Sequence, residues 1–207
     1  RTELLQTIFG VTPAVGGQMQ MAGELFAPRN PREAIRAGLA LAPEDRKQHG
    51  LILQMAVREN ASLASLSRDQ QNGLLNFKAE EKVATEAVEQ LAIKTPDLDQ
   101  STMNLSGGNQ QKVVLGKWLA LKPRVLLLDE PTRGIDVGAK REMYRLMEQL
   151  AADGVAVLFV SSELEEVLGM ADRALVMHEG RIAGELPRDQ LSEQAVMQLA
   201  TGIPLAA

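Results

Sequence analysis

Two acidic residues that directly follow an apolar run could support phosphate chemistry. Val125–Leu128 is an uninterrupted aliphatic run, and Asp129 and Glu130 come next. Such a run is typical of a buried parallel strand, and open α/β sheets bind ligands at the carboxyl ends of their strands. At that position Asp129 could hold Mg²⁺, and Glu130 could orient or deprotonate an attacking water. A strand that merely ends in two solvated acids is the commoner alternative for so short a motif.

A glycine-containing loop upstream of this run is a candidate phosphate site. Ser106 suits the N-cap of a helix, and Gly107 and Gly108 let the backbone approach an anion closely. The helix that follows would direct its free N–H groups toward that point. Alone, the loop would be interpreted as an ordinary capped helix. Its combination with Asp129 and Glu130 is far more specific.

The elements expected to position these residues alternate between helix and strand. We expect helices at 2–9, 31–38, 109–121, 138–152, 164–170 and 190–200, and strands at 18–22, 39–42, 125–129, 155–160, 174–177 and 182–186. Short apolar strands separated by helices predict an α/β fold with a parallel sheet covered on both faces. The strands at 125–129 and 155–160 should be buried. From 54 to about 105 only helical spacing occurs, which predicts an all-helical insertion.

Composition excludes several classes of function. The chain has 207 residues, and 22 Lys and Arg against 27 Asp and Glu give a net charge of −5. This balance argues against a protein that binds nucleic acid mainly through charge. The absence of cysteine excludes disulfides, thiolate zinc sites and a cysteine nucleophile. The two histidines are far apart in the sequence, and the apolar runs are too short for a membrane-spanning helix.

Three motifs together resemble those of ATP-binding-cassette (ABC) ATPases. Leu105–Lys112 resembles the signature motif, Val125–Glu130 the Walker B strand, and Gly134–Asp136 the D-loop. The resemblance runs from residue 1 to about 187 and implies a P-loop NTPase-type sheet whose P-loop and first strands are missing. The sheet would therefore expose an apolar edge. The implied parts are a helical subdomain at about 54–107, a core at 108–187 and a C-terminal helix and tail at 188–207.

Further sequence motifs resemble those of one branch of this family. Residues 43–47, 109–112 and 131–140 are similar to the second cassette of bacterial sugar importers of the ribose, galactose, arabinose and autoinducer-2 type, in which two cassettes are fused. The resemblance implies the carboxyl-terminal cassette of a longer protein, with ATP and Mg²⁺ as cofactors. Its partners would be the other cassette, membrane permease subunits and, indirectly, a periplasmic sugar-binding protein, but no nucleic acid. It would lie peripherally on the cytoplasmic face of the inner membrane.

Three features depart from the ABC pattern. By position, Arg1 would replace the P-loop lysine and Thr2 would supply the Mg²⁺-binding hydroxyl, although Arg1 could simply be a solvated terminal residue. Ser162 occupies the place of the switch histidine, and it could instead cap the helix at 164–170. Glu44 replaces the Q-loop glutamine. Its carboxylate could reach a metal or the attacking water, or it could belong to a charged turn.

ABC sites are composite, so the resemblance implies two different roles for this chain. Its intact signature would complete the ATP site of a partner cassette, with Ser106–Gly108 binding the γ-phosphate and Asp136 monitoring closure. Its own site would hold nucleotide with little turnover, and we expect no meaningful ATPase activity from the isolated chain. The residues expected to serve nucleotide or metal are Arg1, Thr2, Glu44, Ser106, Gly107, Gly108, Asn109, Gln110, Asp129, Glu130, Asp136 and Ser162.

Two other functions stay open at this point. One is a non-transport ABC ATPase of translation or DNA repair, although such proteins usually keep the switch histidine and often carry basic surfaces. The other is a structural half that docks on a permease without binding nucleotide.

Overall fold

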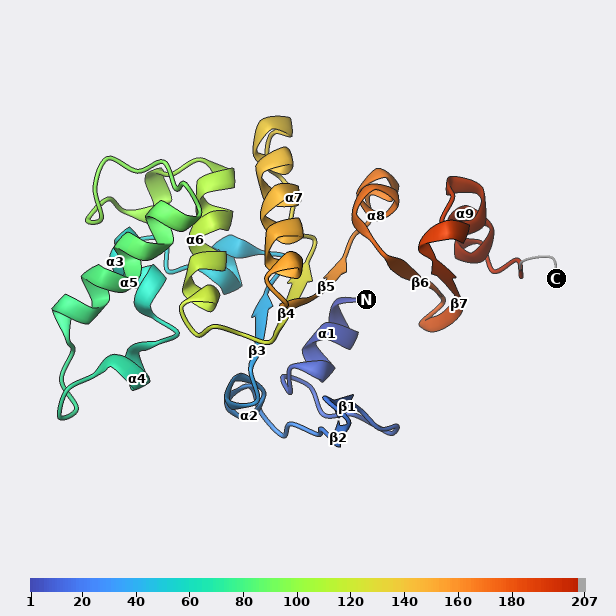
Figure 1. Cartoon of the computed structure of the whole chain (residues 1–207), viewed down its shortest axis with the longest axis horizontal. Helices are drawn as coiled ribbons and strands as arrows, with labels where there is room; N and C mark the ends of the chain where they lie inside the picture. The colour runs from blue at the N-terminus through green and yellow to red at the C-terminus, as the bar shows by residue number, and fades with distance from the viewer. Residues whose placement is uncertain (205–207) are drawn as a thin grey trace. The chain divides into compact units, whose positions relative to one another are not determined.

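The computed structural model describes residues 1–204 and divides into two compact units. The first unit comprises Thr2–Phe159, and the second comprises Arg1 and the residues from Val160 onward. Figure 1 shows the chain coloured from its N-terminus in blue to its C-terminus in red.

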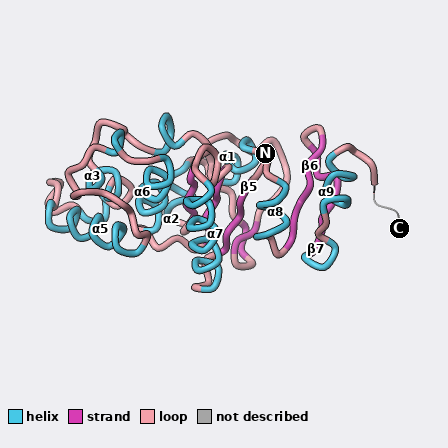
Figure 2. The backbone as a smooth tube through the Cα atoms, turned by 90° about the horizontal axis from the view of Figure 1, so that it is seen from above, coloured by secondary structure: helices cyan, strands magenta, loops and turns pink. Residues whose placement is uncertain are grey.

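A three-stranded sheet with the order β3-β4-β5 forms the centre of the first unit, and its strands lie side by side (Figure 2). Strand β3 (Leu39–Ala42) runs parallel to β4 (Val125–Asp129), and Ala42 lies opposite Leu128. The side chains of residues 126–128 are at most 1% exposed. This register brings the segment after β3 to the same edge of the sheet as the carboxylates after β4. The predicted α/β fold with a parallel sheet is confirmed.

The prediction that 155–160 is a buried strand is wrong in its burial. Strand β5 (Ala156–Val160) forms, but none of its residues is buried, and Leu158 is 40% exposed. The physical reason is its place at the edge of the three-stranded sheet, where β4 is its one neighbour. The apolar run therefore predicted the strand correctly but did not predict how exposed its residues are.

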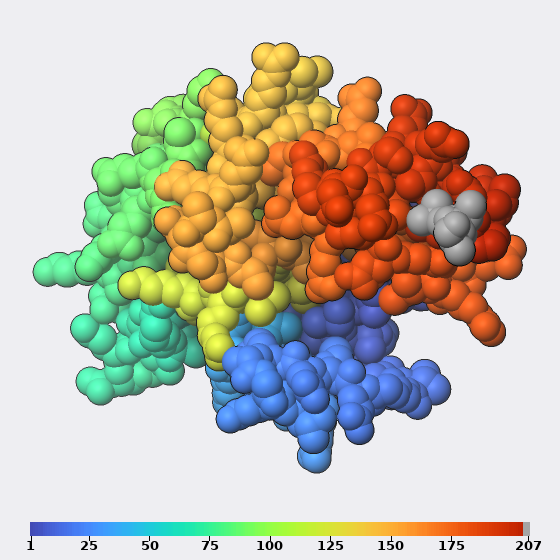
Figure 3. Space-filling view, turned by 45° about the vertical axis from the view of Figure 1, so that its right-hand side comes forward, coloured from blue at the N-terminus to red at the C-terminus, as the bar shows by residue number. Residues whose placement is uncertain are grey.

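Helices and a short hairpin complete the first unit around this sheet. Helix α1 (Thr2–Ile8) contacts β4 and buries Leu5, and α2 (Pro31–Arg36) begins at the predicted N-cap Asn30, whose side chain accepts from the Glu33 N–H. The other elements are β1 (Gln20–Met21) paired with β2 (Glu24–Leu25), a π-helical turn (Arg46–Gly50), α6 (Gly107–Leu119) and α7 (Val137–Ala152). On the face shown in Figure 3, α7 lies beside the green helices of the insertion.

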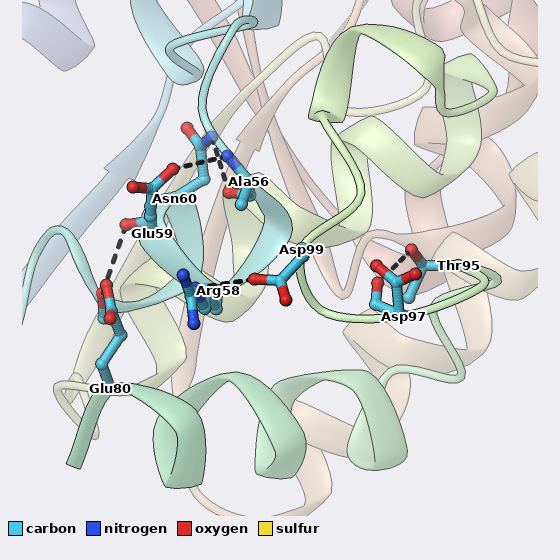
Figure 4. Close-up of polar contacts among 9 residues, drawn as sticks. Ala56, Arg58, Glu59, Asn60, Glu80, Thr95, Asp97 and Asp99 are labelled. Atoms are coloured by element: carbon cyan, nitrogen blue, oxygen red, sulfur yellow. Dashed lines mark hydrogen bonds and ion pairs between the residues drawn. The ribbon is translucent and has the colours of Figure 1, made fainter. Parts of the chain in front are cut away.

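The insertion between β3 and β4 is helical, as predicted. It contains α3 (Val57–Ser62), α4 (Leu66–Asp69), α5 (Phe77–Gln90) and a 3₁₀ turn (Thr102–Asn104). Ala61, Ala84 and Ala87 form a small core against Leu98. Because these alanine side chains are small, α3 and α5 can approach each other closely. Figure 4 shows the polar contacts at the start of α3, where the Glu59 carboxylate accepts from the Ala56 N–H at 2.7 Å.

The second unit is a hairpin packed against a helix. Helix α8 (Leu164–Met170) leads to antiparallel β6 (Arg173–His178) and β7 (Arg181–Pro187), followed by a 3₁₀ turn (Arg188–Gln190) and α9 (Glu193–Ala200). Glu179 and Gly180 both have positive φ, which suits a tight hairpin turn. Val176, Leu186 and Leu199 form the core of this unit.

Candidate functional site

Asp129 lies at the carboxyl end of β4 with most of its carboxylate withdrawn from solvent. The residue is 3% exposed, and its Oδ1 atom has no hydrogen-bond partner among the described residues. The Thr2 hydroxyl hydrogen-bonds to the same carboxylate. Burial raises the pKa of Asp129, while the Thr2 hydrogen bond lowers it and the charge of Glu130 raises it. A cation bound next to this unpaired, buried oxygen and the Thr2 hydroxyl would offset the cost of burying the carboxylate.

Glu130 follows in an uncommon backbone conformation. Its φ of 49° lies in the left-handed region, and its carbonyl accepts from the Arg133 N–H at 3.1 Å. Left-handed non-glycine residues cost on the order of 1 kcal/mol and often occur at functional sites. The turn ends the strand abruptly and leaves Glu130 half-buried next to buried Asp129.

The loop at Ser106 has the predicted capped-helix geometry. Helix α6 begins at Gly107, two residues earlier than expected, and Ser106 is its N-cap. The Ser106 Oγ atom accepts from the Asn109 N–H at 3.4 Å and from the Asn109 side-chain amide at 2.9 Å. Ser106 itself is exposed, so the start of this helix is open to a ligand on that side.

The two glycines of this loop are also needed for packing, which the sequence interpretation missed. A Cβ on Gly108 would lie 2.6 Å from the Cβ of Ala139, and one on Gly107 would lie 2.7 Å from an Arg46 nitrogen. Both distances are shorter than real Cβ contacts. Both glycines therefore bring the start of α6 against neighbouring segments, whether or not an anion is bound.

Asp136 lies in the predicted D-loop and caps α7. Its Oδ1 atom accepts from the Ala139 N–H at 2.9 Å, and this bond lowers the pKa of the exposed Asp136 carboxyl. The loop turns at Gly134, whose φ is 67°. The start of α7 therefore contacts the start of α6 through Ala139 and Gly108.

Glu44 and Arg133 form an ion pair between the segment after β3 and the D-loop. This contact does not decide between the two expectations for Glu44, a carboxylate that reaches a metal or water and a charged turn. Arg46 also contacts the D-loop, and nothing in its spacing indicated this.

Two further predicted residues, Arg1 and Ser162, belong to the second unit. The Arg1 guanidinium donates to the Ser161 carbonyl at 2.9 Å. The interpretation of Ser162 as a helix cap is wrong, because the N-cap of α8 is Glu163, and the Ser161 hydroxyl accepts from the Glu163 N–H at 2.9 Å. The hydroxyl of Ser161, one residue before Ser162, therefore accepts the hydrogen bond from the start of the helix instead.

Two lysines of α6 are buried, and the sequence interpretation missed both. Lys112 pairs with Glu142 at 2.7 Å and donates to the Ala92 carbonyl at 3.0 Å. The Lys117 ammonium donates to the Gly50 carbonyl and lies 5.3 Å from the ring centroid of Trp118. Burial lowers the pKa of Lys117 to about 8. Their helical positions are compatible with solvent, so no pattern in the sequence revealed their burial.

Protein side chains alone do not form a metal cage in the described part of the chain. Residues 1–204 contain no cluster of three or more His, Cys, Asp or Glu side chains able to hold a metal ion. Among the same residues, no helix combines the length and apolar character needed to cross a bilayer.

Comparisons with known proteins agree with the motifs and the fold. The family described as ABC transporter matches residues 1–133, and this chain belongs to that family. Ribose import ATP-binding proteins from Yersinia pestis and Bacillus subtilis are 49% and 48% identical to it over 98% of the chain. The chain spans about 40% of the length of these curated relatives.

Solved structures show the same fold. The ADP conformation of MJ1267, an ATP-binding cassette of an ABC transporter, has a TM-score of 0.79 at 22% identity, covering 98% of this chain and 83% of that one. A dimeric post-hydrolysis state of the ATP-binding cassette MJ0796, bound to ADP and Pi, has a TM-score of 0.75 at 21% identity, covering 90% and 79%. These structures support the fold, and the family match over residues 1–133 confirms the resemblance to ABC ATPases.

Proposed function

We propose that this chain is the second nucleotide-binding cassette of an ATPase that drives import of a sugar, with ribose as the first candidate. The single observation that carries the proposal is the pairing of buried Asp129, at the end of β4, with a Ser106-capped helix in the same unit. The names of the 48–49% identical relatives support both the ATPase and the sugar. These names favour sugar import over a non-transport ABC ATPase of translation or DNA repair.

The chain's own nucleotide site would be built around Asp129. Thr2 and Asp129 would hold Mg²⁺, because one offers a hydroxyl and the other an orphaned buried carboxylate oxygen. The ion would supply charge stabilisation at the phosphates. Glu130 would orient or deprotonate a water on the exposed side of the turn. We expect slow turnover by this cassette, because Arg1 and Ser162 replace a lysine and a histidine of the ABC pattern.

The start of α6 would serve a nucleotide held by a partner cassette. Ser106 is exposed, and the positive end of the helix that it caps favours a terminal phosphate. Asp136 is exposed on the neighbouring loop and would sense the partner's approach. The cassette would bind membrane permease subunits and lie peripherally at the inner membrane. Its activity would depend indirectly on a sugar-binding protein.

The experiment compares steady-state ATP turnover of the two-cassette protein, assembled with its permease, after single substitutions. Ser106→Ala should lower turnover about a hundredfold, because one transition-state donor or its positioning is lost. Glu130→Gln should lower it far less. Ser192→Ala is the matched control, since Ser192 caps α9 by accepting from the Ala195 N–H. Equal losses for Ser106→Ala and Glu130→Gln would contradict the proposed asymmetry.

A further inference from the structure

Three segments meet at the guanidinium group of Arg46. This residue begins the π-helical turn after β3. Its Nη1 atom donates to the Arg133 carbonyl at 3.0 Å and its Nη2 atom to the Gly134 carbonyl at 3.2 Å. Its Nε atom donates to Gln110 Oε1 at 3.3 Å. The planar fork of an arginine suits several fixed acceptors at once, whereas a lysine ammonium is a single point charge.

The acceptor on α6 is itself held rigidly. Gln110 is 4% exposed, and its side-chain amide donates to the Thr102 carbonyl at 3.0 Å. Asn60, fully buried in α3, donates to the Thr102 hydroxyl at 3.4 Å. Arg46 thus connects the D-loop carbonyls to a buried polar network that reaches into the helical insertion.

A second link and a close approach reinforce the same junction. The ion pair between Glu44 and Arg133 joins the same two segments from the other direction. A Cβ on Gly107 would lie 2.7 Å from Arg46 Nη2 and 3.1 Å from the Gly134 carbonyl oxygen. A side chain at position 107 would therefore crowd the guanidinium and the Gly134 carbonyl.

We propose that Arg46 is a positioning residue that fixes the start of the signature helix and the D-loop at one spacing. Both segments then face a partner cassette as a single preformed surface. The role in transport rests on the proposed function, but the positioning itself does not. Arg46 touches no nucleotide in this role, and it acts through Gln110, Arg133 and Gly134.

Hydrogen exchange in the two-cassette protein tests the positioning directly. In Arg46→Gln, peptides covering 106–112 and 132–138 should both exchange about tenfold faster, because the guanidinium restrains the backbone of both segments. Arg46→Lys should exchange at an intermediate rate. The matched control is Arg58→Gln, which removes an arginine paired with Asp99 at 3.0 Å in the insertion, away from the D-loop. Unchanged exchange, a change in one segment alone, or an even increase over the whole chain would overturn the proposal.

A kinetic measurement separates this inference from the proposed function. Arg46→Gln should lower kcat for ATP about tenfold in the assembled transporter, with nucleotide affinity at this chain's own site unchanged, and Arg46→Lys should recover part of the loss. If Ser106→Ala has no effect on turnover while Arg46→Gln accelerates exchange in both segments, the proposed function fails and the positioning role stands. If Ser106→Ala abolishes turnover but Arg46→Gln changes neither exchange nor kcat, the positioning role is refuted and the function stands.

Discussion

Replacing Lys117 by Met should stabilise the first unit at neutral pH and remove a pH dependence of its unfolding. Burial lowers the pKa of Lys117 from 10.5 to about 8 in the folded chain. A shift of this size corresponds to about 3 kcal/mol of unfavourable free energy for holding the ammonium in the folded state below pH 8. Met has a similar length and carries no charge.

The depressed pKa of Lys117 determines the direction of the pH dependence of stability and the pH range in which it occurs. Between about pH 8 and 10.5 the unfolded state binds more protons at Lys117 than the folded state, so the stability of the wild type rises with pH there. From pH 8 to 9.5 the gain should be about 2 kcal/mol. Lys117→Met leaves the Gly50 carbonyl without its donor, which costs on the order of 1 kcal/mol. The variant should therefore be about 1–2 kcal/mol more stable at pH 7.

Urea unfolding followed by fluorescence measures both effects. Trp118 is the only tryptophan in the sequence and is adjacent to Lys117, so its emission reports on this unit. The control is Lys82→Met, because Lys82 is exposed and pairs weakly with Glu86. It should keep the wild-type pH profile. Parallel profiles for wild type and Lys117→Met between pH 7 and 9.5 would refute the reasoning.

Two further predictions concern the candidate site. Gly108→Ala should lower the free energy of unfolding by about 1–3 kcal/mol, because its Cβ would lie 2.6 Å from that of Ala139; an unchanged melting temperature would contradict this. Asp129→Asn should weaken Mg²⁺-dependent nucleotide binding at least tenfold while raising stability at pH 7, because it removes a buried carboxylate whose pKa burial raises. Equilibrium titration with a fluorescent ATP analogue and thermal unfolding measure the two effects, and weaker binding together with lower stability would argue against this assignment.

The sequence predicts the elements of this fold best where one face or both faces of an element are uniformly buried. The strands at 39–42 and 125–129 occur at the predicted residues, because aliphatic runs between turns have few alternatives. The Asn30 and Ser106 caps were also predictable, since their chemistry is local.

What the sequence did not reveal depends on neighbours far away along the chain. Burial of Lys112 and Lys117 depends on Glu142 and on Gly50, which no periodicity in α6 encodes. The exposure of β5 depends on its place at the edge of the sheet. Arg46 lies 64 and 87 positions from two of its partners. The proposed roles of Asp129, Glu130 and Ser106 stay predictions until nucleotide is bound and measured.

The contact between Gly108 and Ala139 affects how mutants of the signature loop should be interpreted. Residue 108 already has the smallest possible side chain, so a larger one can be accommodated only by reducing residue 139. Inactivity after enlargement at 108 would therefore arise from helix spacing as readily as from a lost phosphate contact. Making the same substitution together with Ala139→Gly restores the space, so activity that returns in the double variant identifies crowding as the cause.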